Sequence, residues 1–138
     1  MTARLGRTIP ALPVRDVAAA VERYRERFGF EAPHVEDGFA LLRRDDAEVH
    51  LWAASDAEWE TRGDLRERPV CSGAESFIAG TASCRIEVED VDALFNELRQ
   101  AEVLHGTSQN AVTVTDFGTR EFHTLDLDGN LLTFFEPV

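Results

Sequence analysis

Hydrophobic and polar positions follow the same order twice along this chain. A segment with apolar residues at helical spacing, PVRDVAAAVERYRERFGF from Pro13, aligns with EVEDVDALFNELRQAEVL from Glu87. Each segment follows a short β-like run, RTIPALPV or TASCRIEV. Each also places an aspartate, Asp16 or Asp90, where its carboxylate can cap the first amides of a helix. The pattern therefore predicts a strand followed by a helix, used twice.

Short alternating runs, which are typical of strands, follow each predicted helix. The first stretch, HVEDGFALLRRDDAEVHLWAAS, is divided into three runs by Asp-Gly at 37–38 and Asp-Asp at 45–46. The second stretch, VLHGTSQNAVTVTDFGTREFHTLDLDGNLLTFFEP, also gives about three strands. Its last two strands meet at residues 128–130, where Gly129 or Asn130 can supply the positive φ of a tight hairpin. The sequence thus predicts an α+β fold built from two βαβββ units.

The 138 residues suffice for one domain and are too few for two ordinary ones. We expect a single domain over 1–138, with unit one at about 7–54, an insertion at about 55–80 and unit two at about 81–138. The insertion is rich in charge, Gly and Ser, and it carries Trp59. Loops longer than roughly 12 to 15 residues usually cover a site or are disordered. Trp59 is therefore predicted to contact a ligand or a second subunit.

The formal charge of −12, from 26 acidic against 14 basic residues, argues against binding to nucleic acid or to anionic membranes. The same charge would attract a cation, although acidic surfaces also serve simply to keep proteins in solution. No stretch approaches the roughly 18 to 20 apolar residues of a membrane span, and the first residues lack the apolar run of a signal peptide. With only two cysteines, the composition predicts a cytoplasmic protein.

Three segments resemble the bleomycin-resistance proteins: IPALPVRDVAAAVERYRERFGF, HVEDGFALLRRDD and FGTREFHTLDLDGN. These proteins belong to the vicinal oxygen chelate superfamily, with glyoxalase I, fosfomycin-resistance enzymes and extradiol dioxygenases. The resemblance covers nearly the whole chain apart from the insertion. It implies the glyoxalase/bleomycin-resistance fold, in which duplicated βαβββ units form a concave mixed sheet. It also implies a homodimer that exchanges its N-terminal strands, because Pro10 matches the proline of the exchanged strand.

Of the metal-binding places of the superfamily's enzymes, only one falls on a strong metal ligand, His50, and one ligand cannot hold a catalytic ion. The places correspond to Ile9 and His50 in unit one and to Ser83 and Thr133 in unit two. Isoleucine has no donor atom, serine is a poor ligand, and a catalytic ion needs about three protein ligands. No nucleophile motif, phosphate loop or paired-carboxylate motif is visible either. The sequence therefore predicts a protein without a metal or another cofactor and without catalytic activity.

The bleomycin-resistance proteins hold a cationic glycopeptide antibiotic in grooves between subunits without altering it. Aromatic rings suit such a ligand because they stack on planar heterocycles and attract cations. The resemblance implies ligand binding by His34, Phe39 and Phe117, which stand at its groove positions. Trp52 and Trp59 are further candidates, and Thr133, which replaces a metal-binding carboxylate, is assigned to the same cavity.

Several alternatives remain open. Aromatic residues at alternating strand positions are also typical of an ordinary core, and isolated histidines of ordinary surface or core positions. An unusual ion site could recruit His50 with His123 or Glu121, which would make the protein a metal-dependent lyase, transferase or dioxygenase. The fold could also bind a different hydrophobic or cationic metabolite.

Overall fold

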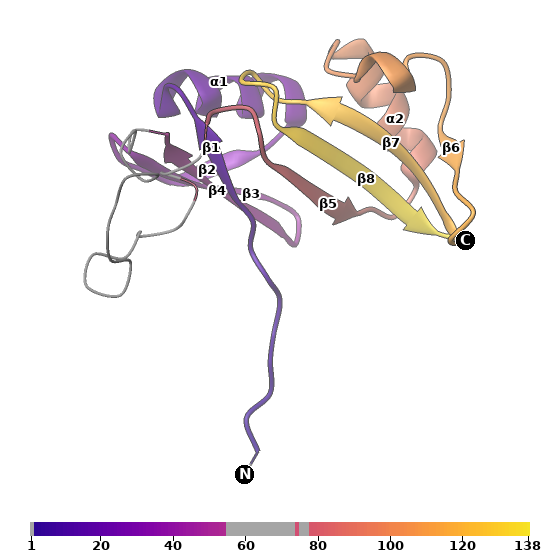
Figure 1. The fold of residues 1–138 in the computed structure, drawn as a ribbon, viewed down its shortest axis with the longest axis horizontal. Coiled ribbons are helices and arrows are strands. Elements are labelled where there is room, and N and C mark those ends of the chain that lie inside the picture. Colours follow the sequence, from indigo (N-terminus) through magenta and orange to yellow (C-terminus); the bar gives the residue numbers. More distant parts are fainter. Residues whose placement is uncertain (1, 55–73, 75–77) are drawn as a thin grey trace.

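The structure is a computed structural model, and it describes residues 2–54, 74 and 78–138. Each half of the chain folds into a strand, a helix and three further strands, as the repeated pattern predicts (Figure 1). Unit one consists of β1 (Ala11–Val14), α1 (Val17–Phe28), β2 (Glu31–Val35), β3 (Phe39–Arg44) and β4 (Ala47–Ala53). Unit two consists of β5 (Ser83–Glu87), α2 (Val91–Gln100), a 3-10 turn (Gly106–Ser108), β6 (Thr113–Val114), β7 (Thr119–Leu125) and β8 (Leu131–Pro137).

The strands form two mixed four-stranded sheets with the same topology. Sheet one has the order β1-β4-β3-β2, and sheet two has the order β5-β8-β7-β6. In each sheet the first and last strands of the unit are parallel, and the other neighbours are antiparallel. Ala11 lies opposite His50 in sheet one, and Arg85 lies opposite Thr133 in sheet two. The predicted repeat of the fold is therefore confirmed at the level of register.

Both helices begin where the sequence predicts. The Asp16 carboxylate accepts a hydrogen bond from the Ala19 amide, and the Asp90 carboxylate accepts one from the Ala93 amide, each at 3.1 Å. These contacts satisfy amides that have no partner inside the helix. At the predicted β7–β8 hairpin, Gly129 has a φ of 100°. The positive φ thus falls on the glycine, which has no Cβ to clash with its backbone.

The first strand is shorter than the run RTIPALPV predicts. It begins at Ala11, and residues 2–9 are exposed and extend away from the body of the molecule (Figure 1). Pro10 has no N–H to donate to a ladder, although its carbonyl accepts a hydrogen bond of 2.9 Å from the His50 amide. The chain before Pro10 therefore lies outside the sheets.

Each sheet packs one face against the helix of its own unit. Leu12, Val49 and Leu51 of sheet one are fully buried on the side of α1, and Phe122 and Leu132 of sheet two are fully buried on the side of α2. Side chains alternate along a strand, so the residues between these positions point to the opposite side. We call the side of each sheet that is turned away from its helix the far face. No helix in the described part of the chain is long and apolar enough to span a membrane.

Polar contacts join the two units, one set buried and one at the surface. The Asn130 side chain, which is fully buried, donates to the Pro13 carbonyl at 2.8 Å and accepts from the Ala82 amide at 3.1 Å. Arg44 forms a two-pronged ion pair with Glu97 of α2, with N···O distances of 2.7 and 3.0 Å. The β7–β8 turn and α2 are thereby held against unit one.

Candidate functional site

A row of aromatic rings lies on the far face of sheet one. Phe39 of β3 is directly opposite Trp52 of β4, and their ring centroids are 5.0 Å apart in an edge-to-face arrangement. The Phe39 ring also contacts the His50 ring at 5.1 Å and the His34 ring at 6.0 Å. The structure therefore brings together three of the predicted ligand-binding residues, His34, Phe39 and Trp52, and adds His50 to them.

A covered carboxylate lies at the end of this row. The Glu48 side chain is only 5% exposed and accepts hydrogen bonds from Arg43 Nε at 3.1 Å, Arg7 at 3.2 Å and His50 Nε2 at 2.9 Å. The hydrogen bond from His50, aided by the two arginines, lowers the pKa of Glu48. An ionised carboxylate only accepts hydrogen bonds, so Nε2 of His50 carries the hydrogen. Glu48 thus fixes the orientation of the His50 ring beside Phe39.

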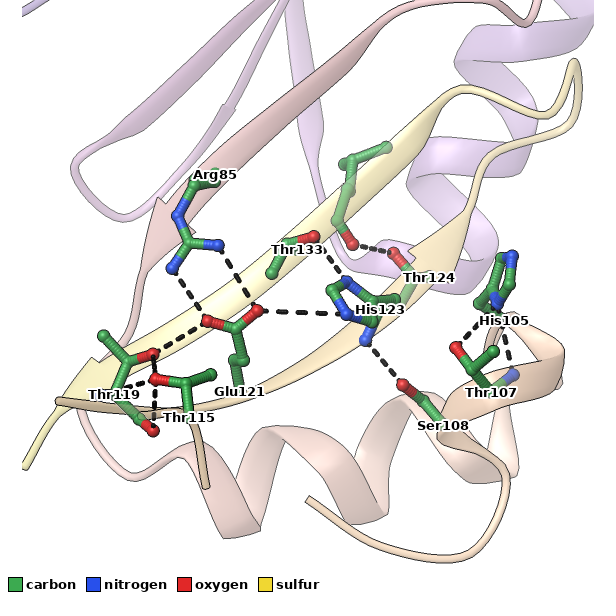
Figure 2. A network of polar contacts seen from close by, with 11 residues as sticks. Arg85, His105, Thr107, Ser108, Thr115, Thr119, Glu121, His123, Thr124 and Thr133 are labelled. Carbon is green, nitrogen blue, oxygen red and sulfur yellow. Dashed lines mark hydrogen bonds and ion pairs between the residues drawn. The ribbon is translucent and has the colours of Figure 1, made fainter. Parts of the chain in front are cut away.

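The far face of sheet two carries a second ion pair, centred on Glu121 (Figure 2). Both oxygens of Glu121 accept from the Arg85 guanidinium, at 2.8 and 3.3 Å, and one also accepts from the Thr119 hydroxyl at 2.8 Å. The Arg85 hydrogen bonds are the main cause of the lowered pKa of Glu121. His123 Nε2 lies 3.8 Å from the same carboxylate. On the far face of each sheet, a buried glutamate carboxylate therefore lies between an arginine and a histidine.

Two aromatic rings flank the Arg85 guanidinium. Its carbon lies 4.7 Å from the centroid of Phe135 on β8 and 5.7 Å from the centroid of Phe117. Phe117 lies in the connection between β6 and β7 and is 67% exposed, which is unusual for so large an apolar side chain. Phe117, one of the predicted ligand-binding residues, is therefore exposed beside a charged group that the sequence did not single out.

The remaining predicted site residues differ in their surroundings. Thr133 is 3% exposed, and its hydroxyl shares a hydrogen bond of 2.7 Å with His123 Nδ1. It lies on the far face of sheet two, on the same strand as Phe135 and two positions before it. Pro10 is half-buried directly before β1. Trp59 lies outside the described residues.

The donor atoms at the superfamily's metal-binding places do not suit a divalent ion. His50 donates from Nε2 to Glu48, the Thr133 hydroxyl bonds to His123, and Ile9 contributes no donor. Within residues 2–54, 74 and 78–138, no group of three or more His, Cys, Asp or Glu side chains could hold a metal. The far faces thus offer rings and paired charges rather than a set of converging ligands.

Sequence reasoning did not assign ligand binding to Glu48, Arg43, Arg85 or Glu121. A signal for them existed, because Glu48 alternates in phase with His50 and Trp52, and Glu121 with His123. Charged residues in phase on one sheet face indicate ion pairs; Arg43 and Glu48 pair between neighbouring strands, whereas Arg85 of β5 and Glu121 of β7 pair across β8. Their partners could not be chosen before the register of the strands was known.

Residues 4–134 match the model of the Glyoxalase/Bleomycin resistance protein/Dioxygenase superfamily. The chain belongs to this superfamily. Within it, the chain is 44% identical over 131 residues to bleomycin resistance proteins of Geobacillus stearothermophilus and Staphylococcus aureus. The alignment covers 95% of this chain and 96% of each relative. The resemblance inferred from the sequence motifs is therefore confirmed.

A solved structure of the superfamily shares the same fold over nearly its whole length. It is a bleomycin-binding protein from the bleomycin producer Streptomyces verticillus, in complex with copper(II)-bleomycin. It is 28% identical to this chain, covers 97% of both chains and has a TM-score of 0.65. The arrangement of two βαβββ units is thus that of a known antibiotic-binding protein.

Proposed function

We propose that this protein binds a cationic, aromatic glycopeptide antibiotic of the bleomycin type and protects its target by sequestration, without altering the drug. The observation that carries this proposal is the 44% identity to bleomycin resistance proteins over nearly the full length of both chains. The aromatic row of Phe39 and Trp52 supports it, since planar heterocycles stack on such rings. Sequestration depends on mass action, so protection requires tight binding and stoichiometric amounts of protein.

Metal-independent binding fits the chemistry of the far faces. The carboxylates and imidazoles there are engaged with arginines, threonines and one another. They form a polar surface between aromatic side chains. A ligand on these faces would be held by stacking and hydrogen bonds.

The proposal includes a homodimer in which the N-terminal segments are exchanged, in the cytoplasm. The extended, exposed course of residues 2–9 supports exchange, because the backbone of this segment lies outside the sheets of its own chain and can pair with another copy, although the Arg7 side chain contacts Glu48 (Figure 1). Leu5, which is 95% exposed, would be buried against the partner subunit in such a dimer. Light scattering after size-exclusion chromatography tests this part: a mass of one chain at micromolar concentration would contradict it.

Binding is tested by titrating chelator-treated protein with metal-free bleomycin, with calorimetry to give the stoichiometry. We expect saturable binding at about one ligand per chain with a dissociation constant below about 1 μM. Recovery of chemically unchanged bleomycin after prolonged incubation would support sequestration. Modified drug would show an enzymatic activity, and no binding at high micromolar ligand would refute the proposed function for this drug.

A further inference from the structure

Arg85 is held in one orientation on the far face of sheet two. Its guanidinium uses two N–H groups for the two oxygens of Glu121, and this geometry fixes the plane of the group. Glu121 is in turn held by the Thr119 hydroxyl, which contacts the Thr115 hydroxyl at 2.8 Å (Figure 2). The Arg85 guanidinium is therefore preorganised by its contacts with Glu121, unlike a surface arginine without such contacts.

The Arg85 side chain nevertheless remains 44% exposed. Its Nε–H and one N–H on each terminal nitrogen have no acceptor among the described residues, because only two of the five donors are used. A surface arginine with free donors is common. Here, however, the guanidinium lies over the rings of the half-buried Phe135 and the exposed Phe117, so its free donors are beside aromatic side chains.

The charge of this site is balanced. The carboxylate of Glu121 is 6% exposed and ionised, and it neutralises the guanidinium. A cationic ligand would therefore meet little repulsion from Arg85, while a flat group could stack on the guanidinium as it does on a ring. The free N–H groups would suit oxygen or nitrogen acceptors at the edge of that flat group.

We propose that Arg85 contacts the ligand directly and, together with Phe117 and Phe135, forms a site for a flat amide or heteroaromatic group that carries hydrogen-bond acceptors. This inference rests on the proposed function, because the ligand is taken to be a peptide-like aromatic antibiotic. Arg85 supplies a planar group with free N–H donors, and Phe117 and Phe135 supply aromatic rings next to it.

The test compares three variants with wild-type protein by calorimetric titration with metal-free bleomycin. Arg85→Lys keeps the charge but removes the planar group. The double variant Arg85→Met/Glu121→Gln removes the ion pair without leaving a buried, unpaired carboxylate. Arg120→Met is the matched control: Arg120 is adjacent to Glu121 in sequence and forms an equally two-pronged pair with Asp92 of α2, away from the far face. Thermal unfolding of each variant checks that it is folded.

We expect about tenfold weaker binding by Arg85→Lys and by the double variant, and unchanged binding by Arg120→Met. Wild-type affinity in Arg85→Lys would overturn the inference, because charge alone would then suffice; so would wild-type affinity in the double variant. If the double variant does not fold, Arg85→Lys decides the question. Absence of bleomycin binding by the wild-type protein would overturn the proposed function as well, so the two failures are distinguishable.

Discussion

The Tyr24 hydroxyl of α1 donates a hydrogen bond of 2.8 Å to the carboxylate of Asp126, 102 residues further along the chain. Both side chains are buried, and together they link the helix of unit one to the β7–β8 turn of unit two. The other oxygen of Asp126 accepts from the amides of residues 128, 129 and 130. One carboxylate thus shapes the turn and holds it against the other unit.

We expect Tyr24→Phe to destabilise the protein by about 2 kcal/mol, since a hydrogen bond to a buried charged group is lost without a change of shape. Urea denaturation would show a lower midpoint with an unchanged m-value. The ring itself remains packed against Phe28 and Phe30. An unchanged midpoint would mean that the hydroxyl contributes nothing to the joint between the units.

Gly80 is predicted to tolerate no side chain. It has a φ of 82°, and a Cβ added there would lie 2.1 Å from the carbonyl oxygen of Asp128. Gly80→Ala should therefore cost about 3 kcal/mol or more, from backbone strain and from displacement of the β7–β8 turn. Gly38→Ala is the control, because a Cβ at Gly38 would meet nothing within 4 Å. Equal thermal stability of the two variants would contradict this prediction.

The stability of the protein should depend on the protonation of Asp128. Burial raises the pKa of this carboxyl above its ordinary value of 3.8, although the Arg15 amide donates to one of its oxygens. The other oxygen is buried without a hydrogen-bond partner in the described part of the chain. The folded state therefore binds this proton more tightly than the unfolded state, and the stabilising contribution is lost as the pH rises through the folded pKa.

Asp128→Asn removes this titration. We expect the variant to be more stable than the wild type at pH 7, by no more than about 1 kcal/mol, and the difference to disappear near pH 3. Denaturant unfolding at several pH values measures it. A variant that is less stable than the wild type at pH 7 would show that the Arg15 contacts outweigh the cost of burying the charge.

Trp52 is predicted to report ligand binding. It lies beside Phe39 on the far face of sheet one, and the chain has two tryptophans. Trp52→Phe should abolish most of the fluorescence change on addition of bleomycin and weaken binding about threefold to tenfold, because a smaller ring stacks less. Trp59→Phe provides the comparison. If the fluorescence change survives in Trp52→Phe and disappears in Trp59→Phe, the ligand does not contact the row on sheet one.

Much of the fold could be predicted because its determinants are local. The capping aspartates at 16 and 90, the helical spacing after them and the turn at Gly129 are all within a few residues of the structure that they specify. The repeat extended these local predictions to both units. The length of the first strand could not be predicted in this way, because strand residues need a neighbouring strand and residues 2–9 have none in their own sheet.

The candidate site was only partly predictable for the same reason. By itself, the sequence determined the order of the elements, the alternation that places His50 and Trp52 on one face of their strand, and the superfamily. Only the tertiary structure decided that Arg85 pairs with Glu121 and that Tyr24 reaches Asp126. Helices and turns depend on near neighbours in the chain, whereas the partners of buried charges depend on strand register and on the packing of one unit against the other.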